Sequence, residues 1–142
     1  MFSLSGEVPL SFAADDEVLV FRHTVSGEVL DVSLPDGEQV TEAVTEFHHR
    51  GENAYVGNAE AVADGEQLYV RNCLFCHGPG GVGKIGPSLV DEQLLYPNNK
   101  LDNGLFEAIY GGTVNLMAGW KGRLSQDDIL KVIAYVRSLQ SK

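Results

Sequence analysis

The sequence predicts a mainly helical protein with a short β-hairpin near its N-terminus. Three observations lead to this class. Apolar residues recur at helical spacing in several segments that carry capping residues, a stretch rich in Gly and Pro occupies residues 78–97, and β-forming residues are concentrated between residues 18 and 34. A length of 142 residues favours one domain with an appendage over two domains.

We expect residues 1–57 to form an acidic extension of that domain. Residues 18–21 and 29–34 are two runs of β-formers separated by the turn pair Ser26-Gly27, which predicts a hairpin. A short helix follows and is expected to end at Gly51. Because no linker of low complexity separates the extension from the remainder, we expect it to pack on the helical domain.

Residues 58–142 are expected to form the helical domain itself. A first helix is predicted from Ala59 to about Arg71 with Asn58 as its N-cap, and a second from Asn103 to Tyr110, where two glycines stop it. The last helix begins after the hydroxyl cap Ser125 and continues to the C-terminus with apolar residues at 3.6-residue periodicity.

The charge of the chain is unevenly distributed. Ten basic and 20 acidic residues give a formal charge of −10, and residues 1–60 hold 12 of the acids but only 2 of the bases. Such an excess argues against binding to nucleic-acid phosphates or to an anionic bilayer and favours a basic partner. No apolar run approaches the length of a membrane helix, and the first residues lack the basic start of a signal peptide.

Cys73-Leu74-Phe75-Cys76-His77 is the strongest chemical signal, and it contains both cysteines of the chain. The pattern C-x-x-C-H is typical of a c-type haem attachment site. Two thiols one helical turn apart add to the two vinyl groups of a haem, and the adjacent imidazole then lies under the iron. The motif therefore predicts one covalently bound haem c with His77 as an axial ligand.

Other roles of a cysteine pair fit less well. A redox disulfide of the thioredoxin type requires a βαβ context, and a zinc site requires a second ligand pair that no further cysteine supplies. Two buried thiols can also occur side by side by coincidence. The histidine directly after the second cysteine favours haem attachment over all three.

Met117 is the predicted second axial ligand of the iron. It lies 40 residues after His77 and follows a glycine-led loop, residues 111–116, that is able to bring the thioether back over the ring. An open sixth position is one alternative, and a second histidine is another. The histidines available for that role lie in the acidic extension: His23, His48 and His49.

Three further residues are candidates for contact with the cofactor or its ligands. A ligating histidine normally donates its other N–H to an acceptor, and the backbone carbonyl of Pro87 is suited to that role because proline makes the local chain rigid. Trp120 and Tyr96 carry a ring N–H and an O–H that can bond the haem propionates, or their rings can cover the haem edge.

From Asn58 to Leu139 the chain resembles the class I cytochromes c. The motifs are the helix with Gly65 and Tyr69 before the C-x-x-C-H pattern, Gly86-Pro87-Ser88-Leu89, and the stretch from Trp120 onward. The resemblance implies a class I cytochrome c fold in which the first and last helices cross, so that Gly65 and Tyr69 meet Tyr135. One departure is Met117-Ala118-Gly119, because a proline commonly follows the ligand methionine in that family.

The whole chain is similar to the cytochrome cL family. The residues that carry this likeness are Phe21–Leu30, Lys84–Pro87, Tyr96-Pro97 and Gly104–Gly112. It implies a periplasmic, monomeric one-electron carrier, not an enzyme, that accepts electrons from a PQQ-dependent methanol dehydrogenase and passes them to another cytochrome c. Both calcium- and lanthanide-dependent dehydrogenases have such acceptors, and the sequence does not separate the two.

Some members of this family hold a calcium ion near the haem, and Asp102-Asn103 is an oxygen-rich stretch, but the sequence assigns no ligand set to such an ion. Two alternative functions remain open at this point. One is electron acceptor of a different quinone-dependent alcohol dehydrogenase. The other is a haem sensor or peroxidase-like protein in which Met117 is core filler and the sixth position stays open.

Overall fold

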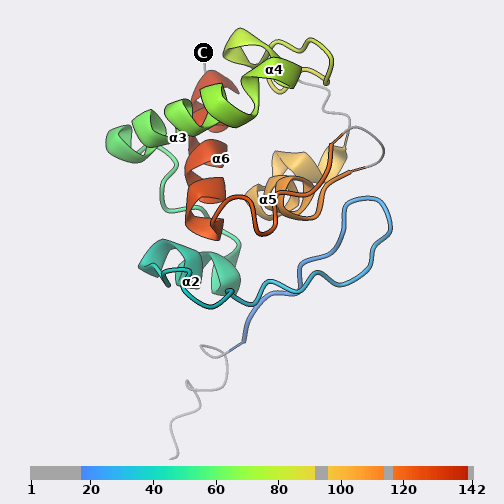
Figure 1. Cartoon of the computed structure of the whole chain (residues 1–142). Coiled ribbons are helices and arrows are strands. Elements are labelled where there is room, and N and C mark those ends of the chain that lie inside the picture. Colours follow the sequence, from blue (N-terminus) through green and yellow to red (C-terminus); the bar gives the residue numbers. More distant parts are fainter. Residues whose placement is uncertain (1–16, 92–95, 114–116, 141–142) are drawn as a thin grey trace, which may run out of the picture.

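This computed structural model describes residues 17–91, 96–113 and 117–140. The described residues form the helices α2 (Glu42–Arg50), α3 (Ala59–Asn72), α4 (Leu74–His77), α5 (Asp102–Gly111) and α6 (Gln126–Gln140), and the 3-10 helices η1 (Pro79–Gly81) and η2 (Pro97–Lys100). In Figure 1, α4 and α2 lie at opposite ends of the molecule and α6 runs between them. The mainly helical class is confirmed.

The four helices that the sequence predicts are present as α2, α3, α5 and α6. Gly51 ends α2 in the left-handed conformation with a φ of 71°. The Asn58 side chain accepts a hydrogen bond from the Ala61 N–H at 3.0 Å, and the Ser125 hydroxyl accepts one from the Asp128 N–H at 3.0 Å. Helix α4 and the two 3-10 helices were not predicted.

Helices α3 and α6 cross in close contact at Gly65. A Cβ atom at this position would lie 2.0 Å from the Lys131 carbonyl oxygen and 3.1 Å from the Cβ of Tyr135. The Tyr69 and Tyr135 rings meet one turn further along, with their centroids 5.2 Å apart. The crossing expected from the family resemblance is therefore present, and it requires a residue without a side chain.

The predicted β-hairpin is not supported, because the described residues contain no strand. Only the single antiparallel bridge between Arg22 and Val29 pairs the two runs, with hydrogen bonds from Leu30 N–H to the Phe21 carbonyl and from His23 N–H to the Glu28 carbonyl, both at 2.8 Å. Residues 1–16 of the predicted extension lie outside the described part of the chain.

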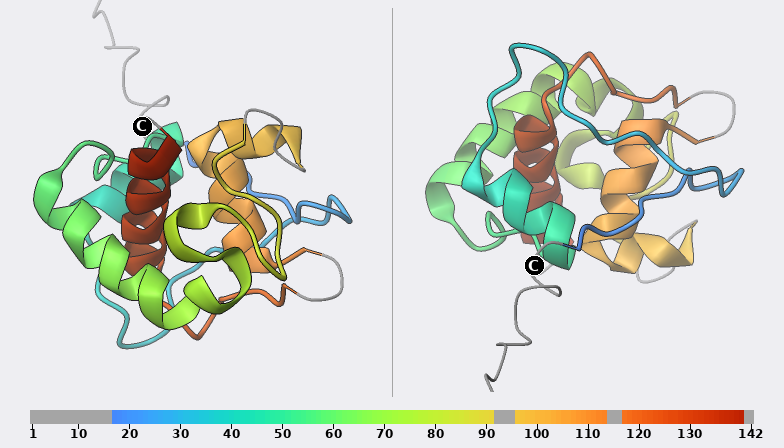
Figure 2. Two further views of the ribbon diagram at one scale, coloured as in Figure 1. Left: turned by 90° about the horizontal axis from the view of Figure 1, so that it is seen from above. Right: turned by 90° about the horizontal axis from the view of Figure 1, so that it is seen from below.

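The helices take over the hydrogen bonds that a longer ladder would use. The Leu19 N–H donates to the His48 carbonyl of α2 at 2.7 Å, and the Arg22 N–H donates to the Glu107 carboxylate of α5. The Asp31 carbonyl accepts from the Tyr110 hydroxyl at 2.6 Å. Both views of Figure 2 show the segment before α2 running along α5. We call this segment, residues 17–40, the arm. It lies extended on the helices and is not an independent hairpin.

Aromatic side chains join this arm to the core. Phe21 is buried, and its ring centroid lies 5.5 Å from that of Phe47 on α2 and 5.4 Å from that of Phe106 on α5. Phe106 in turn stacks on Tyr110 at 5.2 Å. The arm, α2 and α5 therefore share one hydrophobic core with α3 and α6.

A second link between the segment around α2 and the core is polar and centred on Asp127 in the first turn of α6. Its carboxylate accepts hydrogen bonds from the Tyr55 hydroxyl at 2.6 Å and from the Thr41 hydroxyl at 2.8 Å, and lies 3.2 Å from the Lys131 ammonium. Burial acts to raise the pKa of Asp127, but these donors outweigh it, and the pKa lies below its usual value. Burial, together with the hydrogen bond to Asp127 and its negative charge, raises the pKa of Tyr55 to about 12.

We predict that Gly65→Ala separates α3 from α6 and destabilises the haem-loaded protein by about 3 kcal/mol, at the upper end of the usual effect of overpacking. The added methyl group meets the Lys131 carbonyl, which is backbone and cannot rotate away. Denaturant unfolding measures the loss. Ala63→Ser adds one heavy atom at an exposed position of α3 and is the matched control. An unchanged midpoint in Gly65→Ala contradicts the prediction.

We predict that Asp127 makes the stability depend on pH in the acid range. Because its folded pKa is lowered, the ionised carboxylate stabilises the protein above its unfolded pKa, and this contribution is lost as the pH falls through the folded value. Asp127→Asn should lower the free energy of unfolding at pH 7 by about 1 to 2 kcal/mol and flatten its decrease toward low pH. Denaturant unfolding at several pH values, with Asp128→Asn as the control, tests this; parallel curves for Asp127→Asn and the unmodified protein would contradict it.

Candidate functional site

A cavity of about 430 Å³ opens between α4, α5, α6 and the loops that join them. This volume lies in the range of small-molecule and cofactor sites. Its walls include all seven residues that the sequence singles out: Cys73, Cys76, His77, Pro87, Tyr96, Met117 and Trp120. The fold therefore brings seven residues that are spread between positions 73 and 120 of the chain to one cavity.

The C-x-x-C-H segment forms a single helical turn at the end of α3. The N–H groups of Cys76 and His77 donate to the Cys73 carbonyl at 3.2 and 2.9 Å. Both thiols are free, half-buried and part of the cavity wall. Burial, with a smaller contribution from Cys76, raises the pKa of Cys73 to about 11, so this thiol is protonated at neutral pH.

His77 is buried, with 8% of its surface exposed, and its orientation is fixed from one side. The Pro87 carbonyl oxygen lies 3.0 Å from the imidazole Nδ1. Because a carbonyl only accepts, Nδ1 is the protonated nitrogen, and Nε2 keeps a free lone pair for a metal. Gly86 allows this approach, since a Cβ there would lie 3.0 Å from His77 Cε1.

The loop around His77 is held almost entirely by backbone groups. The Gly83 N–H donates to the His77 carbonyl at 2.8 Å, and the Gly86 N–H donates to the Cys76 carbonyl at 2.7 Å. The buried Tyr69 hydroxyl donates to the Gly78 carbonyl at 2.6 Å. These bonds wrap the glycine-rich segment around the imidazole and leave its far side to the cavity.

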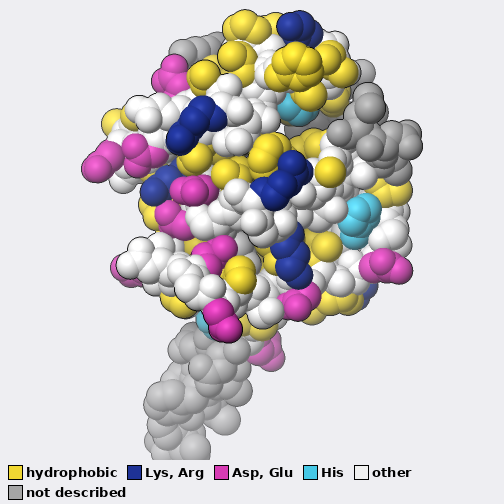
Figure 3. Space-filling view, viewed as in Figure 1, with side chains coloured by type: hydrophobic (Ala, Val, Ile, Leu, Met, Phe, Trp, Pro, Cys, Tyr) yellow, Lys and Arg dark blue, Asp and Glu magenta, His cyan; other side chains and the backbone are white. Residues whose placement is uncertain are grey.

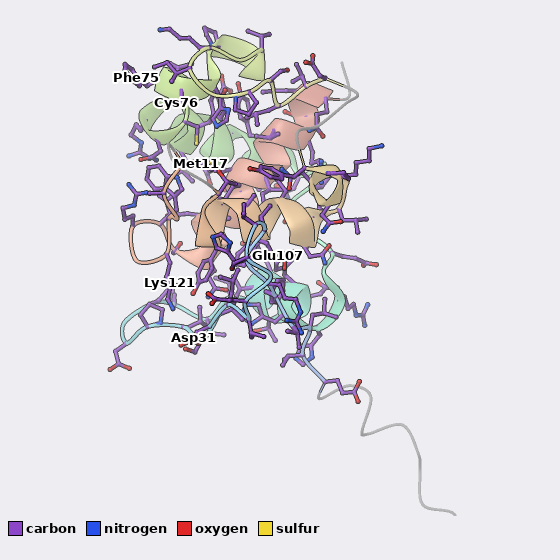
Figure 4. All side chains as sticks on the ribbon, turned by 90° about the vertical axis from the view of Figure 1, so that its right-hand side faces the viewer. Asp31, Phe75, Cys76, Glu107, Met117 and Lys121 are labelled. Carbon is purple, nitrogen blue, oxygen red and sulfur yellow. The ribbon has the colours of Figure 1, made fainter. Side chains whose placement is uncertain are left out.

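Met117 lies on the loop after α5 and is half-buried against the core. Its carbonyl accepts from the Thr113 N–H at 3.0 Å, and Gly112 forms an antiparallel bridge with Ala118. Residues 114–116 of the predicted glycine-led loop lie outside the described residues. Figure 4 shows Phe75, Cys76 and Met117 in this order from the outer end of the molecule inward.

A buried polar atom without a partner among the described residues belongs to a residue of the cavity wall. Asn99 lines the cavity, and its buried side-chain Oδ1 has no hydrogen-bond partner among the described residues. Buried polar atoms are normally paired. The Tyr96 and Trp120 side chains also border the cavity, so a few polar groups are set in walls that include Leu105, Ile109 and Val132.

These residues fit a haem with respect to their chemistry. Two thiols, one imidazole nitrogen and one thioether sulfur line one largely apolar cavity, and the side-chain amide of Asn99 in the same wall carries an NH₂ donor suited to a cofactor with carboxylates at its edge. An amide can present its NH₂ to such a group by rotation about its terminal bond.

The three rival histidines are not among the residues that line the cavity. His48 Nε2 lies 2.6 Å from the Gln126 side-chain oxygen, and His49 Nδ1 lies 2.8 Å from the Glu17 carbonyl. His23 Nδ1 accepts from the backbone of its own turn. All three have structural contacts in the arm and α2.

Asn99 and Arg123 are two of the cavity residues that escaped sequence reasoning. The Arg123 guanidinium lies over the Trp120 ring at 3.9 Å from its centroid and donates to carbonyls next to Met117. Neither residue belongs to a recognisable motif. The only local hint for Arg123 was its spacing of three residues from Trp120.

Comparisons with known proteins place this site in a family. Residues 60–136, more than half of the chain, match the family described as "Cytochrome C oxidase, cbb3-type, subunit III", to which the chain therefore belongs as a cytochrome c domain. It is also similar to the crystal structure of cytochrome CL from Methylophaga aminisulfidivorans, at 47% identity and a TM-score of 0.82, over 84% of this chain and 80% of that one. The chain is a cytochrome cL family member.

Two further cytochromes cL support this membership. That of Hyphomicrobium denitrificans is 42% identical with a TM-score of 0.82, over 85% of this chain and 73% of its own. Cytochrome c-L of Methylorubrum extorquens is 42% identical over 122 residues, or 85% of this chain. The chain spans 62% of the length of that curated relative.

Membership in the cytochrome cL family confirms the resemblance inferred from the sequence and the class I cytochrome c fold, and it implies covalently bound haem c. None of the helices in the described residues is long and apolar enough to cross a membrane. The same residues contain no group of three or more His, Cys, Asp or Glu side chains placed to hold a metal ion. In the oxygen-rich stretch Asp102-Asn103, the Asp102 carboxylate accepts a hydrogen bond from Arg137 Nε at 2.8 Å.

Proposed function

We propose that this protein is a periplasmic one-electron carrier in which Cys73 and Cys76 bind the haem and His77 and Met117 ligate its iron. The observation that carries this proposal is the convergence of these four side chains on one cavity, with the His77 imidazole oriented by the Pro87 carbonyl. Asn99, Tyr96 and Trp120 are the proposed contacts to the haem propionates and edge.

Bound haem supplies an iron centre that gains or loses one electron, and methionine ligation with burial favours its reduced state. The chain contributes a rigid, largely apolar setting for this exchange. Leu105, Ile109 and Val132 form part of the apolar cavity wall, and the backbone bonds of the glycine-rich loop hold the segment around His77 in place. With His77 and Met117 both holding the iron, no coordination position would remain for a substrate, so the proposal is a carrier and not an enzyme.

The same geometry supports a division of the chain into two parts. Every residue that lines the cavity lies within residues 58–142, which we assign as the haem domain, and residues 1–57 are the appended extension. The extension contributes Phe21, Val44 and Phe47 to the core but no residue to the cavity wall.

Electrons are proposed to enter and leave at the α4 end of the molecule. Ile85 lines the cavity and is 53% exposed, and Phe75 and Val82 are 74% and 64% exposed. Figure 3 shows hydrophobic side chains gathered at the α4 end. The proposed docking surface is therefore apolar and includes a residue of the cavity wall.

The proposed donor is a PQQ-dependent methanol dehydrogenase, calcium- or lanthanide-dependent, and the proposed acceptor is another cytochrome c. Support comes from the relatives, since one similar cytochrome CL is described as that of a marine methylotrophic bacterium. The proposed state in solution is a monomer. The acidic extension is proposed to speed the encounter with a basic partner by long-range attraction, while the contact for electron exchange is proposed at the α4 end.

We predict that Met117→Ala keeps the covalent haem and most of the fold but opens one axial position. The far-red thioether-to-iron band in the ferric spectrum should disappear, and carbon monoxide should bind rapidly to the ferrous protein. Ala118→Ser, at the exposed neighbouring position, is the control and should keep the band.

Cys73→Ala combined with Cys76→Ala should lose stable haem attachment in the same expression system. A Met117→Ala protein that retains the six-coordinate thioether spectrum would overturn the ligand assignment. Rapid carbon monoxide binding to the unmodified protein would instead favour a haem sensor.

We predict that reduction by the dehydrogenase slows as ionic strength rises, because salt screens the attraction between the acidic extension and its partner. Removing two exposed charges by Glu42→Gln and Glu52→Gln should lower both the second-order rate and its salt dependence. Glu66→Gln with Asp91→Asn removes two exposed charges outside the extension and serves as the control. Stopped-flow reduction at several salt concentrations measures both, and a rate independent of salt rules out steering.

A further inference from the structure

The backbone beside Met117 is held by a side chain from further along the loop. Ala118 and Gly119 directly follow Met117, and neither carries a side chain that can anchor the loop. The Arg123 guanidinium supplies that anchor. Its Nη2 donates to the Gly119 carbonyl at 3.0 Å and to the Ala118 carbonyl at 3.4 Å, and its Nε donates to Gly119 at 3.3 Å.

Arg123 is itself held in place by contacts that do not involve Met117. Its guanidinium lies over the Trp120 ring, 3.9 Å from the centroid, and its own N–H donates to the Trp120 carbonyl at 2.9 Å. The Trp120 N–H donates to the Ile109 carbonyl of α5 at 2.9 Å. The guanidinium is therefore braced against α5 through Trp120.

The loop has little room to settle elsewhere. A Cβ at Gly119 would lie 2.6 Å from the Tyr110 carbonyl oxygen, and one at Gly112 would lie 2.5 Å from the Gly119 nitrogen. The chain after Met117 thus passes in backbone contact with the end of α5, and its carbonyls point to Arg123 on the open side.

We propose that Arg123 is a positioning residue for the Met117 ligand: its guanidinium ties the carbonyls of residues 118 and 119 so that the thioether stays directed into the cavity. This inference rests on the proposed ligation of the iron by Met117. A thioether is an uncharged ligand at the end of a flexible side chain, so the stiffness of its backbone governs how often it leaves the metal. Charge-assisted hydrogen bonds to two successive carbonyls supply that stiffness.

Only arginine has the geometry for this arrangement. A planar fork of N–H groups reaches two carbonyls while its face lies on an indole ring, whereas a lysine ammonium is a single rotating point charge. Arg123→Lys therefore keeps the charge and removes the brace. Arg123→Gln removes both.

The experiment measures how readily the thioether leaves the iron in the haem-loaded protein. Cyanide binding to the ferric form requires Met117 to dissociate, so its rate reports the dissociated fraction, and the far-red band reports the bound fraction directly. We expect cyanide to bind about tenfold faster to Arg123→Gln, a change in the ligand equilibrium of about 1.4 kcal/mol. Arg123→Lys should behave similarly, and both should lose the far-red band on warming well below their unfolding temperature.

Lys121→Gln is the matched control. Lys121 lies in the same loop and carries the same charge, but its ammonium donates to the Asp31 carbonyl and lies over the Tyr110 ring. Its substitution should leave the cyanide rate and the far-red band unchanged. If Arg123→Gln does not accumulate as folded protein, Arg123→Lys provides the measurement instead, because it retains the charge and the alkyl part of the side chain.

The outcomes separate this inference from the function on which it rests. Unmodified protein without the far-red band overturns both the Met117 ligation and the role of Arg123. If the unmodified protein has the band but the Arg123 variants bind cyanide no faster than it does, only the role of Arg123 is overturned. An equal acceleration in Lys121→Gln also overturns it, because the effect is then one of charge and not of the brace.

Discussion

The backbone contact between α3 and α6 at Gly65 determines where the site can form. Helix α3 ends at Cys73, so its crossing with α6 fixes the place at which the two thiols and His77 begin. Helix α6 presents Val132 and Val136 to the cavity. A wider crossing would move the thiols away from the apolar wall that faces them. The geometry of the cofactor site thus depends on a residue that does not touch it.

Backbone hydrogen bonds then convert this crossing into a rigid site. The segment after His77 has few side chains able to pack, and its amides instead bond to the carbonyls of Cys76, His77 and Gly81. On the opposite wall, the segment after Met117 bonds to the carbonyls of Ile109 and Tyr110 at the end of α5. His77 at the end of α4 and Met117 on its loop are consequently each followed by an irregular segment that is tied to helices at several points.

Much of the helical fold and of the candidate site was predictable from the sequence, because the residues that indicate them lie close together in the chain. The caps Gly51, Asn58 and Ser125 are recognisable from their own neighbourhoods, and they gave the helix ends to within about two residues. The C-x-x-C-H pattern by itself indicated haem attachment. The Pro87 contact was accessible because a buried imidazole requires an acceptor and a rigid proline segment lies close by in the chain.

The errors have a tertiary cause. The β-forming residues of the arm suggested a ladder, but Phe21 is drawn into an aromatic cluster with Phe47 and Phe106, and the arm bonds to helices instead. Asn99 and Arg123 were missed for a similar reason. Their significance comes from a cavity and from two carbonyls that only the folded chain brings to them.

Besides the buried Phe21, several contacts of the arm with the helices are made by its backbone carbonyls, and this affects how its exposed residues can diverge. The carbonyls of Glu17, Asp31 and Val32 accept from side chains of His49, Tyr110 and Gln126. Every residue type offers such a carbonyl. The exposed side chains of the arm can therefore be exchanged over generations, altering its charge toward a new partner, while its path over the helices is inherited unchanged.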